Sequence, residues 1–191
     1  EVIDIGFCGT EEIYFATNDL HTDGGVMVTA SHNPSDYNGM KIVGREAKPI
    51  SMDSGLAEIK DLAENLTQKP SGGELITTKK NIRKNYLNKV LSFVDTTELE
   101  ALKILVNAGN GCAGPVIDAM EDLLPFEFHK INHHPDGSFP NGIPNPLLPE
   151  NRSVTAKAVV ELGADLGIAW DGDFDRCFFF DENGQFIDNY Y

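Results

Sequence analysis

Basic residues are scarce in this chain of 191 residues. Lys and Arg together number 15 against 30 Asp and Glu, which gives a formal net charge of −15. Phosphate-rich polymers and anionic membrane surfaces are bound through basic faces, so this balance excludes a general nucleic-acid or membrane-surface binder. An acidic protein can still bind a small anion where a metal ion and a few basic groups gather at one point.

Cysteines and long apolar runs are also scarce. Cys8, Cys112 and Cys177 are far apart and form no CxxC pair, so neither a zinc site nor a disulfide framework is predicted. Apolar runs such as 167–170 and 178–180 are far too short to cross a bilayer. Residue 1 does not open a charged segment followed by an apolar one, as a signal peptide would. These absences predict a protein of the reducing cytoplasm.

In the first half of the chain, short apolar runs alternate with helical spacing. The run 25–30 (GVMVTA) is continuously apolar, which predicts a strand buried on both faces. The segment 51–66 is predicted to form a helix with one buried face, capped by Ser51 or Asp53. The elements expected here are strands at 2–7, 25–30 and 40–43, helices at 11–20, 51–66 and 82–94, and a loop at 69–74.

The second half restarts this alternation after the polar segment 95–100. Asn183-Gly184 predicts a hairpin turn. We expect strands at 103–107, 126–131, 165–170, 177–180 and 186–187, helices at 115–124 and 151–162, and a proline-rich loop at 135–149. Strands that alternate with helices predict an α/β protein of two tandem domains, with mixed, largely parallel sheets flanked by helices. We place the domain boundary between residues 95 and 96.

Three carboxylates stand within five residues directly after the strand predicted at 165–170. Asp171, Asp173 and Asp175 alternate in the segment WDGDFDR, and carboxylates at this spacing repel each other unless a cation binds them. Ligands of open α/β sheets bind beyond the carboxyl ends of the strands. Oxygen ligands favour Mg²⁺ or Ca²⁺, but an EF-hand would need glycine where Arg176 stands. A magnesium site open to a phosphate oxygen fits better, with a solvated acidic turn as the alternative.

A second polar segment, TASHNPSDYNG at 29–39, follows the strand predicted at 25–30. Its turn-forming residues predict a tight, exposed loop. Ser31 is a candidate nucleophile with His32 as its helper, and Lys41 lies close enough in sequence to place an ammonium near Ser31. A hydrolase triad is a weaker interpretation, because no GxSxG segment is present and adjacent residues seldom point the right way for proton transfer between them. A polar surface turn is the plain alternative.

These segments are similar to those of a known family. TASHNPSDYNGMKIV (29–43) resembles the active-site serine segment of the α-D-phosphohexomutases, the phosphomannomutase and phosphoglucomutase family, and DGDFDR resembles that family's magnesium loop. VNAGNGCAGP (106–115) and PDGSFPNGIPNPLLPEN (135–151) resemble its second domain, so the resemblance covers nearly the whole chain. The sequences GIPNPLLPEN (142–151) and WDGDFDRCFFFDENGQF (170–186) are most similar to those of bacterial phosphomannomutases. One departure is visible, since most relatives have glycine where Phe174 stands.

The resemblance implies an isomerase that interconverts mannose 6-phosphate and mannose 1-phosphate and feeds GDP-mannose and surface polysaccharide synthesis. Phosphate would pass through a phosphoserine and a hexose 1,6-bisphosphate, with Mg²⁺ as the cofactor and hexose phosphates as the partners. Neither nucleic acid nor membrane would be bound. The residues it assigns are Ser31, His32 and Lys41 as catalytic, Asn33 and Arg176 as phosphate-binding, and Asp171, Asp173, Asp175 and Ser31 as metal-binding.

The same resemblance implies a partial chain. Residues 1–95 would be the C-terminal part of the phosphoserine-bearing domain 1, and residues 96–191 most of the metal-binding domain 2. The family's sugar-recognition loop and its phosphate-binding domain lie downstream of the metal loop. We therefore expect the remainder of the enzyme to be missing and the isolated chain to show no measurable turnover.

Two other functions stay open at this point. Gly109, Gly111 and Gly114 satisfy the GxGxxG pattern of a dinucleotide-binding Rossmann unit. That unit also needs an acidic residue about 20 positions on, at the end of the next strand, where Ile131 and Asn132 stand instead. The glycines are more simply a tight turn between a strand and a helix. The third possibility is an inert phosphosugar-binding domain.

Overall fold

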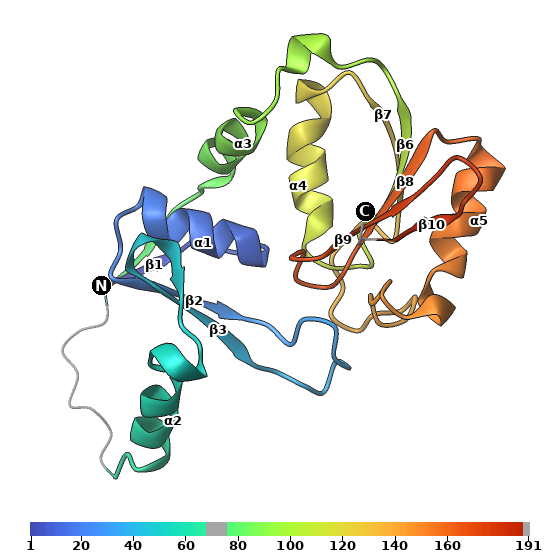
Figure 1. Ribbon diagram of the computed structural model, residues 1–191. Coiled ribbons are helices and arrows are strands. Elements are labelled where there is room, and N and C mark those ends of the chain that lie inside the picture. The colour runs from blue at the N-terminus through green and yellow to red at the C-terminus, as the bar shows by residue number, and fades with distance from the viewer. Residues whose placement is uncertain (68–75, 189–191) are drawn as a thin grey trace.

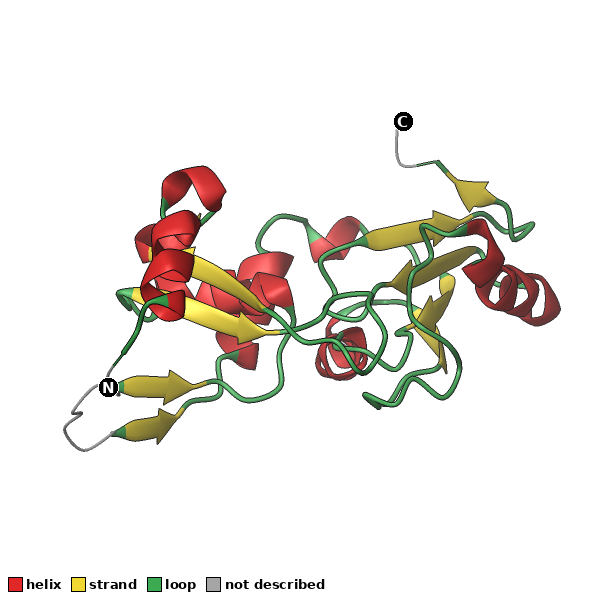
Figure 2. Cartoon of the chain, turned by 90° about the horizontal axis from the view of Figure 1, so that it is seen from below, coloured by secondary structure: helices red, strands yellow, loops and turns green. Residues whose placement is uncertain are grey.

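The structure is a computed structural model, and it describes residues 1–67 and 76–188. Two lobes of strands and helices lie side by side (Figure 1). Seen from below, the strands of the two lobes lie at opposite ends of an elongated molecule, with helices and loops between them (Figure 2). Within the described ranges, no helix is long and apolar enough to cross a membrane.

The N-terminal lobe has two small sheets. β1 pairs in parallel with β5, and β2, β3 and β4 form a three-stranded antiparallel sheet. A tight loop rather than a crossover helix joins β2 to β3, so these strands pair antiparallel. The elements of this lobe are β1 (Val2–Asp4), α1 (Thr10–Asp19), β2 (Gly24–Val28), β3 (Met40–Gly44), β4 (Lys48–Pro49), α2 (Leu56–Glu64), β5 (Thr77–Lys79) and α3 (Arg83–Leu91).

The C-terminal lobe is built on one five-stranded sheet in the order β10-β9-β8-β6-β7. Pairing is parallel between β7, β6 and β8 and antiparallel between β8, β9 and β10. Its elements are β6 (Lys103–Asn107), α4 (Ala113–Met120), β7 (Glu127–Ile131), α5 (Ser153–Leu162), β8 (Leu166–Trp170), β9 (Cys177–Phe180) and β10 (Phe186–Ile187). The predicted α/β class and mixed sheets are confirmed, although the three-stranded sheet is wholly antiparallel.

Alternate side chains of β6 enter two different cores. Ile104 and Val106 point to the face covered by α4, and Leu105 points to the opposite face, where Val159 of α5 packs on it. A strand covered on both sides is expected to be apolar, as the three central residues of β6 are. A third cluster joins the lobes, where Ala16 of α1 and residues of α3 meet α4. β8 therefore lies in a sheet that has a packed apolar cluster on each face.

Two predictions for the first half were wrong. The strand at 25–30 is not buried on both faces: Met27 of β2 is 6% exposed, but Val26 and Val28 are 52% and 65% exposed. Met27 lies on the side of β2 where α1 packs, and the exposure of Val26 and Val28 shows that the other face of the strand stays open. An apolar run of this length cannot by itself distinguish one covered face from two.

The helix predicted at 51–66 is shorter and less buried than its spacing indicates. Ser51 precedes a 3-10 turn, Met52–Ser54, and α2 begins only at Leu56, after Gly55 with a φ of 124°. No residue of α2 is buried, and the side chain of Leu62 is 69% exposed. The expected apolar face therefore exists but is not buried by the described residues, and the loop predicted at 69–74 lies outside the described residues. The domain boundary at residue 95 stays a prediction.

Candidate active site

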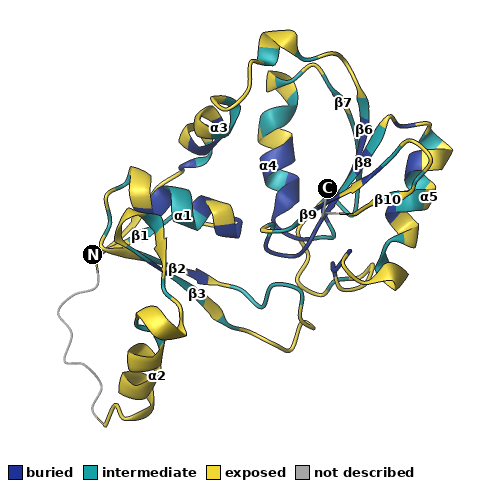
Figure 3. Cartoon of the chain, in the orientation of Figure 1, coloured by how far each residue is buried: buried dark blue, intermediate teal, exposed yellow. Residues whose placement is uncertain are grey.

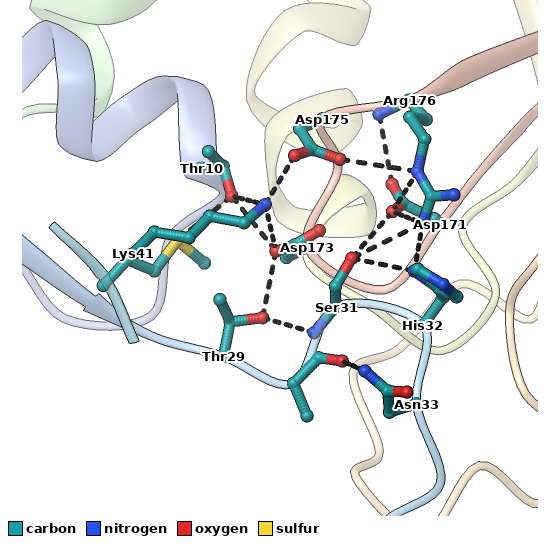
Figure 4. A network of polar contacts seen from close by, with 12 residues as sticks. Thr10, Thr29, Ser31, His32, Asn33, Lys41, Asp171, Asp173, Asp175 and Arg176 are labelled. Carbon is teal, nitrogen blue, oxygen red and sulfur yellow. Dashed lines mark hydrogen bonds and ion pairs between the residues drawn. The ribbon is translucent and has the colours of Figure 1, made fainter. Parts of the chain in front are cut away.

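The serine loop is a closed turn between β2 and β3. The Gly39 carbonyl accepts a hydrogen bond from the Thr29 amide (3.0 Å), and both the amide and the side chain of Asn33 donate to the Ala30 carbonyl. Ser31 has a φ of 55°, in the left-handed region, and its amide donates to the Thr29 hydroxyl (2.8 Å). This backbone turns the Ser31 hydroxyl toward the acidic loop (Figure 4).

The acidic loop follows β8 at the carboxyl end of the five-stranded sheet. Asp171 and Asp173 are almost fully buried, whereas Asp175 is exposed. One carboxylate oxygen from each of the three lies within 4.8 Å of the others. The loop is closed by its own hydrogen bonds, in which the Phe174 and Arg176 amides donate to the backbone carbonyl and the side chain of Asp171. The sequence prediction that these carboxylates converge agrees with this geometry.

The two loops touch although about 140 residues separate them in sequence. The Ser31 hydroxyl lies 3.3 Å from Asp171 Oδ2, within reach as a donor. Gly172 allows this approach, because a β-carbon at this position would collide with the Ser31 carbonyl oxygen. The structure therefore brings the predicted nucleophile and the predicted metal ligands into one site.

His32 and Arg176 lie beside the Ser31 hydroxyl, on the same side as Asp171 (Figure 4). Ser31 Oγ is 3.1 Å from His32 Nδ1 and 3.4 Å from Arg176 Nη2, and Arg176 Nη2 also contacts His32 Nδ1. A guanidinium can only donate, so Nδ1 accepts. The expectation that adjacent residues would not face each other was wrong here, because the left-handed turn at Ser31 swings its hydroxyl back over the imidazole.

Arg176 and Lys41 neutralise different parts of the acidic loop. Arg176 holds Asp171 Oδ2 through Nε (2.9 Å) and Nη2 (2.5 Å). Lys41, from β3, forms ion pairs with Asp173 Oδ2 (2.7 Å) and Asp175 Oδ2 (2.5 Å). The Lys41 ammonium was expected near Ser31, and its contacts are with the carboxylates of the acidic loop, which Ser31 also faces. Asn33, predicted to bind phosphate, donates its amide to the loop itself.

These contacts set opposite pKa directions for the two buried carboxyl groups. Burial raises the pKa of Asp171 above its usual value, against the opposing hydrogen bonds of Arg176. Burial acts in the same sense on Asp173, but the pKa of Asp173 is lowered overall because Lys41, Thr29 and Thr10 donate to it. Partial burial acts to lower the pKa of Lys41, but the hydrogen bonds and charges of Asp173 and Asp175 outweigh it, so the pKa of Lys41 is raised overall. The two buried carboxyl groups therefore differ in how strongly their charged forms are stabilised, and that of Asp173 is stabilised more.

The donor set fits a divalent cation. Asp173 Oδ1 is buried and has no hydrogen-bond partner among the described residues, and a buried carboxylate oxygen is costly to leave unpaired. The three carboxylates can offer only oxygen ligands, which Mg²⁺ and Ca²⁺ prefer. Asp171, Asp173 and Asp175 are therefore the residues that could hold the ion, with the oxygen on Ser31 beside them.

Two threonines belong to the site and were missed in the sequence. Thr10, buried at the start of α1, donates its hydroxyl to Asp173 Oδ2 (3.2 Å) and accepts from Lys41 Nζ (3.1 Å). Thr29 donates to the same carboxylate oxygen (3.0 Å). Thr29 lies within the serine segment, so its position was a usable signal. Nothing local marks Thr10, because its carboxylate partner is 163 residues away.

The glycines of the GxGxxG pattern serve packing between loops. A β-carbon at Gly109 would collide with Pro144, one at Gly111 with the Gly172 backbone, and one at Gly114 with a backbone carbonyl of the next loop. Gly111 thus lets the turn after β6 support the acidic loop, and the adjacent Cys112 amide donates to the Gly172 carbonyl (2.9 Å). The pattern is explained without a dinucleotide.

A cavity of about 890 Å³ opens beside the serine loop. Both lobes line it, and its wall includes Ser31 and Asp173 together with residues of the loops after β6 and β7, among them Asn110 and Asp136. The reacting groups therefore face an open space large enough for a small molecule.

Comparisons with known proteins agree with the two-lobed site. The family model described as phosphoglucomutase/phosphomannomutase, alpha/beta/alpha domain I matches residues 1–70, and domain II matches residues 84–184. The chain is 60% identical over its whole length to the phosphohexose mutases of Xanthomonas campestris pv. campestris, and 52% identical to the phosphomannomutase of Escherichia coli K12. It spans only 43% of the length of either relative.

Two solved structures share the fold. A phosphoglucomutase/phosphomannomutase family protein from Burkholderia thailandensis superposes with a TM-score of 0.82 at 32% identity, covering 98% of this chain and 41% of that one. A phosphomannomutase-like structure from Thermus thermophilus gives a TM-score of 0.83 at 23% identity, covering 99% of this chain and 44% of that one, and shows the fold alone. The chain therefore belongs to the phosphoglucomutase/phosphomannomutase family, of which it carries alpha/beta/alpha domains I and II.

Proposed function

We propose that this chain carries the reacting groups of a phosphohexomutase that interconverts hexose 6-phosphate and hexose 1-phosphate. Relatives named phosphomannomutase, at 52–57% identity, favour mannose as the hexose. Such an enzyme would supply mannose 1-phosphate to GDP-mannose and surface polysaccharide synthesis. The free thiols of Cys8, Cys112 and Cys177 fit a reducing cytoplasm.

One observation carries the proposal. The Ser31 hydroxyl stands 3.3 Å from a carboxylate of a three-aspartate cluster, with a guanidinium and an imidazole beside it. A hydroxyl alone is a poor phosphate carrier, but a divalent cation and Arg176 would together balance the two negative charges of a phosphoserine. This arrangement favours phosphoryl transfer over the inert binding domain, for which no reacting serine is needed.

Each residue has a distinct part in the proposed transfer. A bound Mg²⁺ would neutralise the phosphate and polarise its phosphorus. The bond from phosphorus to Ser31 Oγ breaks while a bond from phosphorus to a sugar hydroxyl oxygen forms, and the proton of the sugar hydroxyl passes, through His32, to the Ser31 oxygen that is released. His32 Nδ1 lies in hydrogen-bond reach of Ser31 Oγ for the proton exchange at that oxygen. Arg176 donates to the phosphate, and Lys41 balances part of the charge of Asp173 and Asp175.

We further propose that the groups that hold the hexose lie in the part of the relatives that this chain does not match. Orientation of reactants accounts for about 7–11 kcal/mol of barrier in well-positioned systems. Without those groups, the chain by itself is expected to show no measurable mutase turnover. A coupled assay with mannose 1-phosphate, Mg²⁺ and a hexose 1,6-bisphosphate measures this.

Transfer of a single phosphoryl group tests the assignment of Ser31. The chain is incubated for hours with a hexose 1,6-bisphosphate and Mg²⁺, and its intact mass and peptides are then measured. We expect one phosphoryl group on the peptide that contains Ser31, none in Ser31→Ala, and normal labelling in the matched loop variant Ser35→Ala. Label at another residue, or label that persists in Ser31→Ala, would overturn the proposal.

A further inference from the structure

Phe174 has an unusual backbone conformation in the middle of the acidic loop. It lies between Asp173 and Asp175, and its φ of 68° is in the left-handed region. Residues with a β-carbon adopt this region reluctantly, and bulky aromatic residues more so than Asn or Asp. A large side chain occupies this position, although glycine would adopt the left-handed conformation more easily. The ring itself must therefore make contacts that offset the cost.

The Phe174 ring lies directly on the N-terminal cap of α1. A β-carbon at Gly9 would come within 2.5 Å of Phe174 Cδ1, so only glycine leaves room for the ring. On its other side the ring centroid is 6.0 Å from that of Trp170, at the end of β8. Phe174 packs against the core cluster between β6 and α4 and also against the cluster of α1 and α3. It thus joins the two lobes at the level of the site.

The polar contacts of the site lie beside this apolar contact. The Thr10 amide, one residue after Gly9, donates to the Asp173 carbonyl (2.9 Å), and the Thr10 hydroxyl donates to the Asp173 carboxylate. The first turn of α1 therefore fixes both the backbone and the side chain of Asp173. These bonds keep their geometry only if the acidic loop stays in contact with α1, and the packing of the Phe174 ring on Gly9 maintains that contact.

We propose that Phe174 is a positioning residue that holds the acidic loop against α1 and so sets the carboxylates relative to Ser31. The inference rests on the proposed function, because it assumes that the three carboxylates bind a divalent cation. It adds that the cation site depends on an aromatic contact between the lobes, Phe174 on Gly9, as well as on its ligands.

Calorimetric titration with Mg²⁺ tests this, with the fluorescence of Trp170, the only tryptophan, as a second readout. Phe174→Gly keeps the left-handed turn and removes the ring, and we expect it to weaken Mg²⁺ binding about tenfold and to shift the Trp170 emission. Gly9→Ala places a β-carbon against the ring and should weaken binding similarly. In the double variant the second change should add nothing, because the contact is already lost.

Phe128→Ala is the matched control. Phe128 packs on the same core cluster but lies on β7, away from α1, so its loss should lower stability and leave Mg²⁺ affinity unchanged. Circular dichroism checks folding, and Phe174→Leu, which keeps an apolar side chain, replaces Phe174→Gly if that variant does not fold. Affinity in the Phe174 variants within twofold of the wild type, or fully additive effects of the two changes, would overturn the inference. Absence of Mg²⁺ binding by the wild type would instead refute the proposed function itself.

Discussion

The two loops of the site extend from sheets that are buried to very different degrees. The acidic loop extends from a five-stranded sheet covered by helices on both faces, and most of the buried apolar residues lie after residue 103 (Figure 3). The serine loop extends from a three-stranded sheet with one open face, next to a helix, α2, that has no buried residue. The three aspartates therefore extend from a packed core, whereas Ser31 is held by the hydrogen bonds of its own loop and by its contacts with the acidic loop.

This difference shows where the coupling between the lobes resides. Lys41 and Thr29 come from the serine lobe, and both bind Asp173. Gly172, on the other side, has no side chain and lets the Ser31 backbone rest on the acidic loop. The two loops thus support each other: groups of the serine lobe hold Asp173, and the acidic loop supports the backbone of Ser31. The following predictions compare how much each lobe contributes.

The largest expected effect comes from the core of the C-terminal lobe. Phe180 is fully buried between β9 and α5, and Phe180→Ala should lower the free energy of unfolding by about 3–5 kcal/mol. The matched change in the open lobe, Leu62→Ala on exposed α2, should stay within about 0.5 kcal/mol. Urea denaturation measures both. Equal losses would show that α2 is packed as well as the sheet.

Loss of a central ligand should be the next largest effect. Asp173→Ala removes a carboxylate that is 1% exposed and contacts Lys41, Thr10 and Thr29. We expect Mg²⁺ affinity to fall on the order of 100-fold, or about 2.7 kcal/mol. Asp136→Ala, an exposed aspartate of the loop after β7, is the control and should bind as the wild type does. Equal calorimetric titrations of both variants would rule out the aspartate cluster as the cation site.

Removal of the Lys41 charge should have a smaller effect of opposite sign. The ammonium competes with a cation for Asp173 and Asp175, so Lys41→Met should tighten Mg²⁺ binding. One charge at this range contributes roughly 1–4 kcal/mol, and the lower end predicts a gain of about fivefold. Lys48→Met removes an exposed charge far from the carboxylates and should change nothing. Weaker binding by Lys41→Met would mean that the ammonium organises the ligands rather than competing.

The smallest effect is expected from Thr10, one of the two threonines that the sequence analysis did not assign to the site. Thr10→Val removes one donor to Asp173 while keeping the shape of the side chain, and should lower stability by about 1 kcal/mol. Thr78→Val, on an exposed position of β5, should be neutral. Thermal unfolding of the two variants makes the comparison. A neutral Thr10→Val would mean that Thr29 and Lys41 satisfy the carboxylate without help.

The sequence predicted the C-terminal lobe better than the N-terminal one. The physical reason is that the apolar runs of the C-terminal lobe are covered by neighbouring elements, whereas those of the N-terminal lobe are partly exposed. The strand predicted at 103–107 coincides with β6, and the Asn183-Gly184 turn does join β9 to β10, because apolar runs there are bounded by strong turn formers. In the N-terminal lobe, apolar runs at β2 and α2 are equally clear. Whether such a run is buried depends on which neighbours cover it, and local spacing does not record that.

The same limit applies to the site. The spacing of the three aspartates at a strand end correctly predicted that their oxygens converge. Proximity of Lys41 to the serine loop was also predicted, but its direction was not, because that depends on the acidic loop of the other lobe. Thr10 was invisible for the same reason. The roles assigned to Ser31 and its neighbours stay predictions until they are measured.

Thermodynamic coupling between Ser31 and the aspartate cluster tests the central claim most directly. Mg²⁺ affinity is measured by calorimetry on the chain with phosphoserine at position 31, on the unmodified chain, and on Ser31→Ala. If the serine and the cluster form one site, the phosphate supplies a charged oxygen ligand, and phosphorylation should tighten Mg²⁺ binding about tenfold or more. Ser31→Ala should bind as the unmodified chain does. Equal affinity of the phosphorylated and unmodified chains would contradict the account.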